Sequence, residues 1–217
     1  VTRLHPCDLE VRRGEVLGVL GVEGAGQREL LRLLAGRLAP TSGEVLRPSR
    51  VGFVPEDRLR DAVIPDFTLA ENRALADAGS RRGLMDWRAE ATAADAIIKS
   101  YDVRAPGAAA PMRALSGGNQ QRFVVGRERT VAPDALVAEN PTRGLDVRAT
   151  ARVLASIRAL AEDERGAAVV YSTDLDEILA LTQRVVVCYA GRLREVPAPA
   201  DPQDRTPYSR ALVGAEP

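Results

Sequence analysis

Short apolar runs of strand length alternate along the chain with stretches that place apolar residues at helical spacing. Residues 15–20 (EVLGVL) form the first run, and residues 28–38 then carry leucines at the spacing of an amphipathic helix. Further apolar runs predict strands, at residues 51–54, 135–138, 167–172, 184–190 and 192–196. Capping residues and helical spacing predict further helices, at residues 68–75, 86–101, 119–130, 147–162 and 207–213.

Strands that alternate with helices predict an α/β fold with a mainly parallel sheet. Residues 66–130 contain no convincing strand, so we expect a helical lobe inserted in the α/β core. Residues 197–217 are rich in proline, and we expect them to form a loose tail with one short helix. We therefore interpret residues 1–217 as a single domain with an inserted helical lobe.

Composition and charge narrow the class of protein. The 217 residues carry 30 basic and 30 acidic side chains, a balance that argues against broad binding to nucleic acid or anionic lipid. The two cysteines, Cys7 and Cys188, have neither metal-ligand spacing nor a disulfide pattern, which favours a reducing compartment. No apolar run approaches the roughly 18–20 residues of a membrane span. The chain begins with Val1, so we expect a fragment of a longer protein.

A glycine-rich loop at residues 21–26 (GVEGAG) follows the first predicted strand and opens the first predicted helix. Glycines allow successive N–H groups to turn inward and form an anion-binding nest at a helix N-terminus. The same context is required of a phosphate-binding loop. A tight turn between strand and helix that binds no ligand is the alternative interpretation.

Three further motifs follow in order. Residues 115–122 read LSGGNQQR, residues 135–146 read ALVAENPTRGLD, and residues 172–177 read STDLDE. Together with the glycine loop, these motifs resemble those of the ABC transporter ATPases, over roughly residues 10–196. The resemblance implies the P-loop ABC-ATPase fold, with a mainly parallel sheet core, a β subdomain and a helical lobe. It also implies ATP and Mg²⁺ as cofactors.

The resemblance assigns a role to each motif residue. The nucleotide-binding positions are Gly21, Val22, Glu23, Gly24, Ala25, Gly26, Gln27 and Arg28. The signature positions, which in the family contact ATP held by a partner domain, are Ser116, Gly117, Gly118, Asn119 and Gln120. Five further roles fall on one residue each: Glu56 for the Q-loop, Asp146 for the D-loop, Glu139 for Mg²⁺, Asn140 for the general base and Thr173 for the switch histidine.

Several of these positions depart from the family pattern. Active members have a lysine that neutralises phosphate charge and a hydroxyl that binds Mg²⁺, where this chain has Gln27 and Arg28. Asn140 cannot accept a proton from water, and Thr173 replaces the switch histidine. Glu139 is a weak candidate for Mg²⁺. We therefore predict weak or absent ATP hydrolysis at this chain's own site.

The signature is intact by contrast. In the family, each ATP lies between the phosphate loop of one domain and the signature of the other. The resemblance therefore implies that this chain completes the competent site of a partner and builds a silent site of its own. Residues 1–20 contain no Phe, Trp or Tyr to stack on adenine, which leaves His5 as the candidate ring.

Three segments narrow the resemblance. Residues 54–58 (VPEDR), 119–121 (NQQ) and 141–146 (PTRGLD) are similar to the second ATPase half of simple-sugar and nucleoside importers, in which two such domains are fused. The implied partners are a second ABC ATPase domain, fused in the same chain, transmembrane permease subunits and, indirectly, a solute-binding protein. No nucleic acid is expected. The implied location is the cytoplasmic face of the plasma membrane.

Four alternatives stay open. Residues 206–212 (TPYSRAL) are similar to the tail of peptide-importer ATPases. A soluble ABC protein that works on ribosomes or DNA is disfavoured by the neutral charge. A non-hydrolysing scaffold that binds no nucleotide is compatible with Gln27 and Asn140. A competent ATPase would need Arg28 and Glu139 to replace the missing groups.

Overall fold

The structure is a computed structural model, and it describes residues 4–79, 81–131, 133–163, 166–197, 201 and 203–215. The chain divides into two compact units. The first unit consists of Val1–Phe53, Asp134–Asn140 and Ile157–Pro217. The second unit consists of Val54–Pro133 and Pro141–Ser156. The prediction of a single domain with a lobe at residues 66–130 stays a prediction, although the second unit contains that range.

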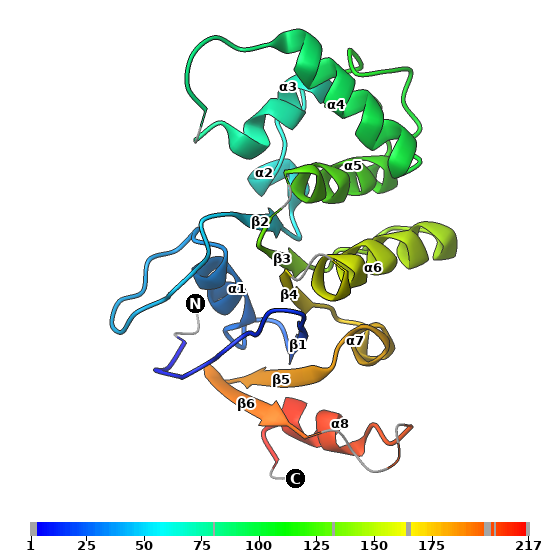
Figure 1. Cartoon of the computed structure of the whole chain (residues 1–217). Helices are drawn as coiled ribbons and strands as arrows, with labels where there is room; N and C mark the ends of the chain where they lie inside the picture. Colours follow the sequence, from blue (N-terminus) through cyan, green and yellow to red (C-terminus); the bar gives the residue numbers. More distant parts are fainter. Residues whose placement is uncertain are drawn as a thin grey trace. The chain divides into compact units, whose positions relative to one another are not determined.

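A six-stranded sheet forms the frame of the first unit (Figure 1). Its strands lie in the order β2-β3-β4-β1-β5-β6. In chain order they are β1 (Val16–Gly21), β2 (Val51–Val54), β3 (Ala135–Glu139), β4 (Ala167–Tyr171), β5 (Arg184–Tyr189) and β6 (Arg192–Val196). The pairs β3–β4, β4–β1 and β1–β5 are parallel, and β5–β6 is antiparallel. The predicted α/β fold with a mainly parallel sheet is confirmed.

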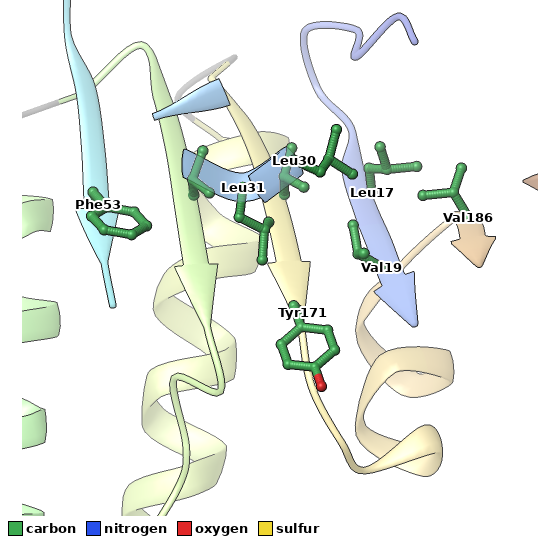
Figure 2. Close-up of a cluster of buried hydrophobic side chains, with 9 residues drawn as sticks. Leu17, Val19, Leu30, Leu31, Phe53, Tyr171 and Val186 are labelled. Carbon is green, nitrogen blue, oxygen red and sulfur yellow. The ribbon is translucent and has the colours of Figure 1, made fainter. Parts of the chain in front are cut away.

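The helices of the first unit cover this sheet. They are α1 (Gln27–Leu34), α7 (Leu175–Leu181) and α8 (Thr206–Leu212). Side chains of α1 and of strands β1 to β5 gather in one apolar cluster, which contains Leu17, Val19, Leu30, Leu31, Phe53, Val137, Val169, Tyr171 and Val186 (Figure 2). This cluster fixes α1, and hence the glycine loop that precedes it, against the sheet.

The first helix is shorter than its leucine spacing predicts. It ends at Leu34, because Gly36 takes a left-handed conformation (φ 71°) and the Arg37 N–H donates back to the Arg32 carbonyl. This is the usual way in which a glycine terminates a helix.

The predicted β subdomain is not present as a separate sheet among the described residues. The sheet that these residues form is the six-stranded sheet described above. Residues 5–14 and 37–50 carry no strand and are mostly exposed. Leu9 and Val11 alternate with polar residues, and both pack, partly buried, against the apolar cluster of the first unit without forming a strand. The antiparallel component is instead the β5–β6 hairpin.

The second unit is helical, and its described residues contain no named strand apart from the last residue of β2. Its elements are α2 (Arg58–Asp61), α3 (Leu69–Ala74), α4 (Trp87–Ser100) and α5 (Gly117–Thr130), with 3₁₀ turns at Leu75–Asp77 and Met112–Ala114. The predicted capping box at Thr68 and Glu71 is present on α3. Helix α6 (Val147–Glu162) begins in this unit and ends in the first.

Polar side chains hold much of the second unit together. Asn72 is fully buried, and its amide bonds the backbone of Ile64, Phe67 and Thr68. Glu90 lies between the guanidinium groups of two arginines, Arg73 at 3.1 Å and Arg81 at 2.6 Å. Buried polar groups of this kind tolerate few alternative packings.

Two further expectations concern the C-terminal tail and a membrane-spanning helix. Tyr208 and Ala211 of α8 are buried, so this helix of the predicted loose tail packs onto β5 and β6. The remainder of that tail, residues 198–200, 202 and 216–217, lies outside the described residues. No helix among the described residues is long and apolar enough to cross a membrane.

Candidate functional site

The glycine loop connects β1 to α1 in the first unit. Gly24 (φ 79°) and Gly26 (φ 109°) both take left-handed conformations, which glycine adopts without steric cost. The Ala25 N–H closes the turn by donating to the Val22 carbonyl at 3.0 Å. Within the described part of the chain, the N–H groups of Gly24, Gly26 and Gln27 donate no hydrogen bond. These donors at a helix N-terminus suit an anion.

The Gln27 side chain points into the unit and not out of the loop. Gln27 is 2% exposed, and its Nε2 donates to the Tyr171 hydroxyl at 3.4 Å. That hydroxyl donates in turn to the Gly21 carbonyl at 3.4 Å. Since Gln27 is neutral and directed toward β4, the loop lacks a cation at the position where the family has lysine. Arg28 is exposed.

Asn140 has a structural role at the end of β3. It is 5% exposed and takes a left-handed conformation (φ 45°), which Asn adopts more readily than most residues. Its N–H donates to the Tyr171 carbonyl at 2.8 Å, and its Oδ1 accepts from the Thr173 N–H at 3.0 Å. The amide at the general-base position therefore ties the end of β3 to the segment after β4.

The residues of the first unit fit phosphate better than they fit Mg²⁺. The loop offers open N–H donors, whereas Glu139 is buried and Arg28 occupies the position of the Mg²⁺-binding hydroxyl. Among the described residues, no three His, Cys, Asp or Glu side chains come together as a metal site, and Glu139 is the carboxylate at the family's Mg²⁺ position.

The signature lies at the N-terminus of α5 in the second unit. Ser116 is the N-cap residue, yet its hydroxyl caps no N–H of the helix. Instead, the hydroxyl accepts from Asn119 Nδ2 at 2.9 Å. Asn119 is itself held, since its Oδ1 accepts from the Arg104 N–H at 2.9 Å and from Arg122 Nη2 at 2.7 Å. The Ser116 proton is left available to an acceptor outside the helix.

Arg58 adds a positive charge to the signature; the sequence places it in the VPEDR segment but assigns it no role in the site. Its Nε donates to Gln120 Oε1 at 3.1 Å, and Gln120 Nε2 donates to the Met112 carbonyl at 3.2 Å. A Cβ on Gly117 would lie 2.5 Å from Arg58 Nη2. The guanidinium therefore lies directly against the first turn of α5.

The Q-loop and D-loop positions belong to the same unit. Glu56 pairs with the mostly exposed Arg143 at 2.5 Å. Gln121 Nε2 donates to the Pro141 carbonyl at 2.9 Å, which fastens α5 to the PTRGLD segment.

Asp146 caps α6. Its Oδ1 accepts from the Ala149 N–H at 2.9 Å. This hydrogen bond, followed by the charge of Arg122, holds the pKa of Asp146 below its ordinary value.

The predicted site residues thus fall into two groups. Residues 21–28, Glu139, Asn140 and Thr173 belong to the first unit, and Glu56, residues 116–120 and Asp146 belong to the second. His5 is exposed, and its N–H donates to the Gly191 carbonyl at 2.7 Å.

Comparison with known proteins identifies the family. Residues 4–143 match the family described as ABC transporter. The chain belongs to the ABC transporter family. The dimeric structure of a post-hydrolysis state of the ATP-binding cassette MJ0796 bound to ADP and Pi matches this fold with a TM-score of 0.79, at 24% identity and over 91% of each chain.

Two curated relatives illustrate the similarity in sequence. The nucleoside import ATP-binding protein NupA of Lactococcus lactis is 36% identical over 91% of this ABC chain and 42% of its own length. The ribose import ATP-binding protein RbsA 1 of Rubrobacter xylanophilus is 36% identical over 97% of this chain and 47% of its own length. The chain therefore spans about half the length of the curated relatives it matches.

Proposed function

We propose that this chain is the ATP-binding domain of an ABC importer for a sugar or nucleoside. Its signature completes the ATP site of a partner domain, and its own phosphate loop builds a weak site. Relatives at 34–38% identity carry names for ribose, glucose, guanosine and nucleoside import, which supports this substrate class.

The observation that carries the proposal is the difference between two helix N-termini. At α5, the Ser116 proton and the Arg58 guanidinium lie beside open N–H groups. At α1, the corresponding cation is absent and Gln27 is hydrogen-bonded into the core. Hydrogen-bond donors and positive charge stabilise the negative charge of a transferring phosphoryl group, so only the N-terminus of α5 suits catalysis.

The signature contributes by donating to phosphate. Ser116 Oγ, the N–H groups of Gly117 and Gly118, and the Arg58 guanidinium are the donors that would meet the γ-phosphate of ATP on the partner. Asn119 and Gln120 orient Ser116 and Arg58 through the hydrogen bonds described above. Loss of one such donor commonly lowers the rate by about 10²–10³.

The phosphate loop of this chain contributes binding without chemistry. The open N–H groups of Gly24, Gly26 and Gln27 suit the phosphates of ATP, but no lysine reinforces them. Asn140 accepts from the Thr173 N–H through its Oδ1 and cannot take a proton from water. Hydrolysis at this site is therefore weak or absent.

The partners follow from the proposed role. They are a second ABC ATPase domain fused in the same chain, transmembrane permease subunits and, indirectly, a solute-binding protein. The domain lies at the cytoplasmic face of the plasma membrane through the permease. The length of the relatives, about twice that of this chain, supports the fused second domain.

A scaffold that binds no nucleotide is the second candidate. The buried Gln27 amide favours it, because the side chain that should face the phosphates is engaged with Tyr171. Calorimetric titration of the 217-residue chain with ATP, with and without Mg²⁺, separates the two candidates when combined with a phosphate-release assay. We expect weak binding without turnover. No binding would favour the scaffold, and clear turnover would contradict both.

A further inference from the structure

The β5–β6 hairpin lies against the phosphate loop in the first unit. Two donors of the hairpin converge on the Ala25 carbonyl of the loop. The Gly191 N–H donates to it at 2.7 Å, and the Cys188 thiol donates to it at 3.0 Å. Because a carbonyl oxygen has two lone pairs, these bonds use its full accepting capacity and fix its direction.

The direction of this carbonyl sets the direction of the next donor. The Ala25–Gly26 peptide is trans and planar, so its C=O and N–H point in opposite directions. With the carbonyl held toward the hairpin, the Gly26 N–H points away from the hairpin. Gly26 is the N-cap of α1, and its N–H is one of the open donors of the loop.

The contact between hairpin and loop is close. A Cβ on Gly26 would lie 3.3 Å from Cys188 Sγ and 3.3 Å from Gly191 Cα. The hairpin itself has little freedom, because Ala190 (φ 47°) and Gly191 (φ 78°) form a two-residue turn between the paired Tyr189 and Arg192. A shift of the hairpin would therefore move the loop.

The protonation of Cys188 matches this role. The thiol is completely buried, and burial, followed by the charge of Glu29, raises its pKa to about 11. Cys188 therefore keeps its proton at neutral pH and remains a donor, whereas a thiolate would repel the Ala25 carbonyl.

We infer that Cys188 and Gly191 are positioning residues, which orient the 25–26 peptide and thereby aim the Gly26 N–H at the phosphates of bound nucleotide. Neither residue needs to touch the nucleotide. The inference rests on the proposed nucleotide binding for the identity of the ligand. The orientation of the peptide is a property of the chain that can be measured without ligand.

Two substitutions of Cys188 separate positioning from space filling. Cys188→Ser keeps a donor in a smaller side chain, whereas Cys188→Val fills the space without a donor. Positioning predicts that ATP binds to Cys188→Ser within about twofold of the unaltered chain, and to Cys188→Val about fivefold more weakly, the factor of one lost hydrogen bond. Space filling predicts the reverse order. Cys7→Ser is the matched control, since Cys7 is exposed and forms none of these bonds.

The test combines calorimetric ATP titration with NMR of the 217-residue chain without ligand. We expect the Ala25 carbonyl ¹³C and Gly26 amide ¹⁵N resonances to move in Cys188→Val, and to lie near their original positions in Cys188→Ser. If the unaltered chain binds no ATP, nucleotide binding fails and these resonances alone decide the inference. Unmoved resonances in Cys188→Val, or tighter ATP binding by Cys188→Val than by Cys188→Ser, would overturn it.

Discussion

The phosphate loop of the first unit and the signature of the second unit use similar parts in different ways. Each is a helix N-terminus with glycine at or beside the N-cap, Gly26 before α1 and Gly117 and Gly118 in the first turn of α5. At α5 the side chains hold one another so that donors remain available, as Asn119 does for Ser116. At α1 the polar side chain Gln27 is directed into the core. The comparison indicates that a phosphate site depends on which donors are left open, more than on the glycine pattern itself.

A negative charge introduced at each of the two N-termini should give the largest contrast. In the full-length protein, Gly117→Asp places a carboxylate against Arg58 where phosphate would bind, and we expect ATP turnover to fall by about 100-fold or more. The matched change Gly24→Asp puts the same charge on the loop proposed to be silent, where a Cβ meets no atom within 4 Å and φ is 79°, a left-handed conformation that Asp adopts more readily than most residues. Turnover should then stay within about twofold. Equal losses of ATP turnover in Gly117→Asp and Gly24→Asp, measured in a steady-state assay, would contradict the proposed difference between the signature and the phosphate loop.

Removal of the signature cation should have the next largest effect. Arg58→Ala deletes the guanidinium beside Gly117, and we expect turnover to fall by about tenfold with partial recovery in Arg58→Lys. Arg60→Ala is the control, because Arg60 lies on the same short helix with 78% of its side chain exposed. A loss in kcat for Arg60→Ala as large as that for Arg58→Ala would argue that α2 acts only through its fold.

Asn140 should matter for stability and not for turnover. Asn140→Ala removes the bond to Thr173 and places alanine at φ 45°, so we expect the free energy of unfolding to fall by about 1–3 kcal/mol. Asn140→Gly, which tolerates this backbone conformation, should lose less. Urea unfolding measures both variants. If ATP turnover disappears in Asn140→Ala while the protein remains folded, Asn140 takes part in the hydrolysis of ATP.

The smallest expected effect concerns pH. The hydrogen bond from Ala149 lowers the pKa of Asp146, so its ionised form stabilises the fold above the ordinary value of 3.8. That contribution is lost as the pH falls through the lowered value. Asp146→Asn keeps a cap that does not titrate, so its unfolding midpoint should depend less steeply on acid pH. If the unfolding midpoints of the unaltered chain and of Asp146→Asn depend on acid pH in the same way, the Asp146 cap contributes no pH dependence to stability.

Much of the fold was predictable from local pattern. The apolar runs locate the strands because strands of a parallel sheet are buried on both faces. Thr68 and Glu71 locate the start of α3 because a capping box lies within four residues. The end of α1 was harder to predict, since Gly36 acts through its backbone conformation and interrupts leucine spacing that continues beyond it.

The character of the site was only partly predictable. The motif positions identify Gln27 as lacking charge, but its inward direction depends on Tyr171, which lies 144 residues further along the chain. Arg58 reaches the signature from α2 through a hydrogen bond to Gln120 of α5. Contacts of this kind join side chains from separate elements, and sequence spacing does not report them.

In the proposed function, the signature and not the phosphate loop carries this chain's share of catalysis. Steady-state ATP turnover of the full-length protein with a matched pair of alanine variants separates these two sites. We expect Ser116→Ala to lower kcat by about 10²-fold, as loss of a transition-state donor does, and Gln27→Ala to leave kcat within about twofold. A loss of turnover in Gln27→Ala with unchanged turnover in Ser116→Ala would show that the phosphate loop carries the catalysis instead.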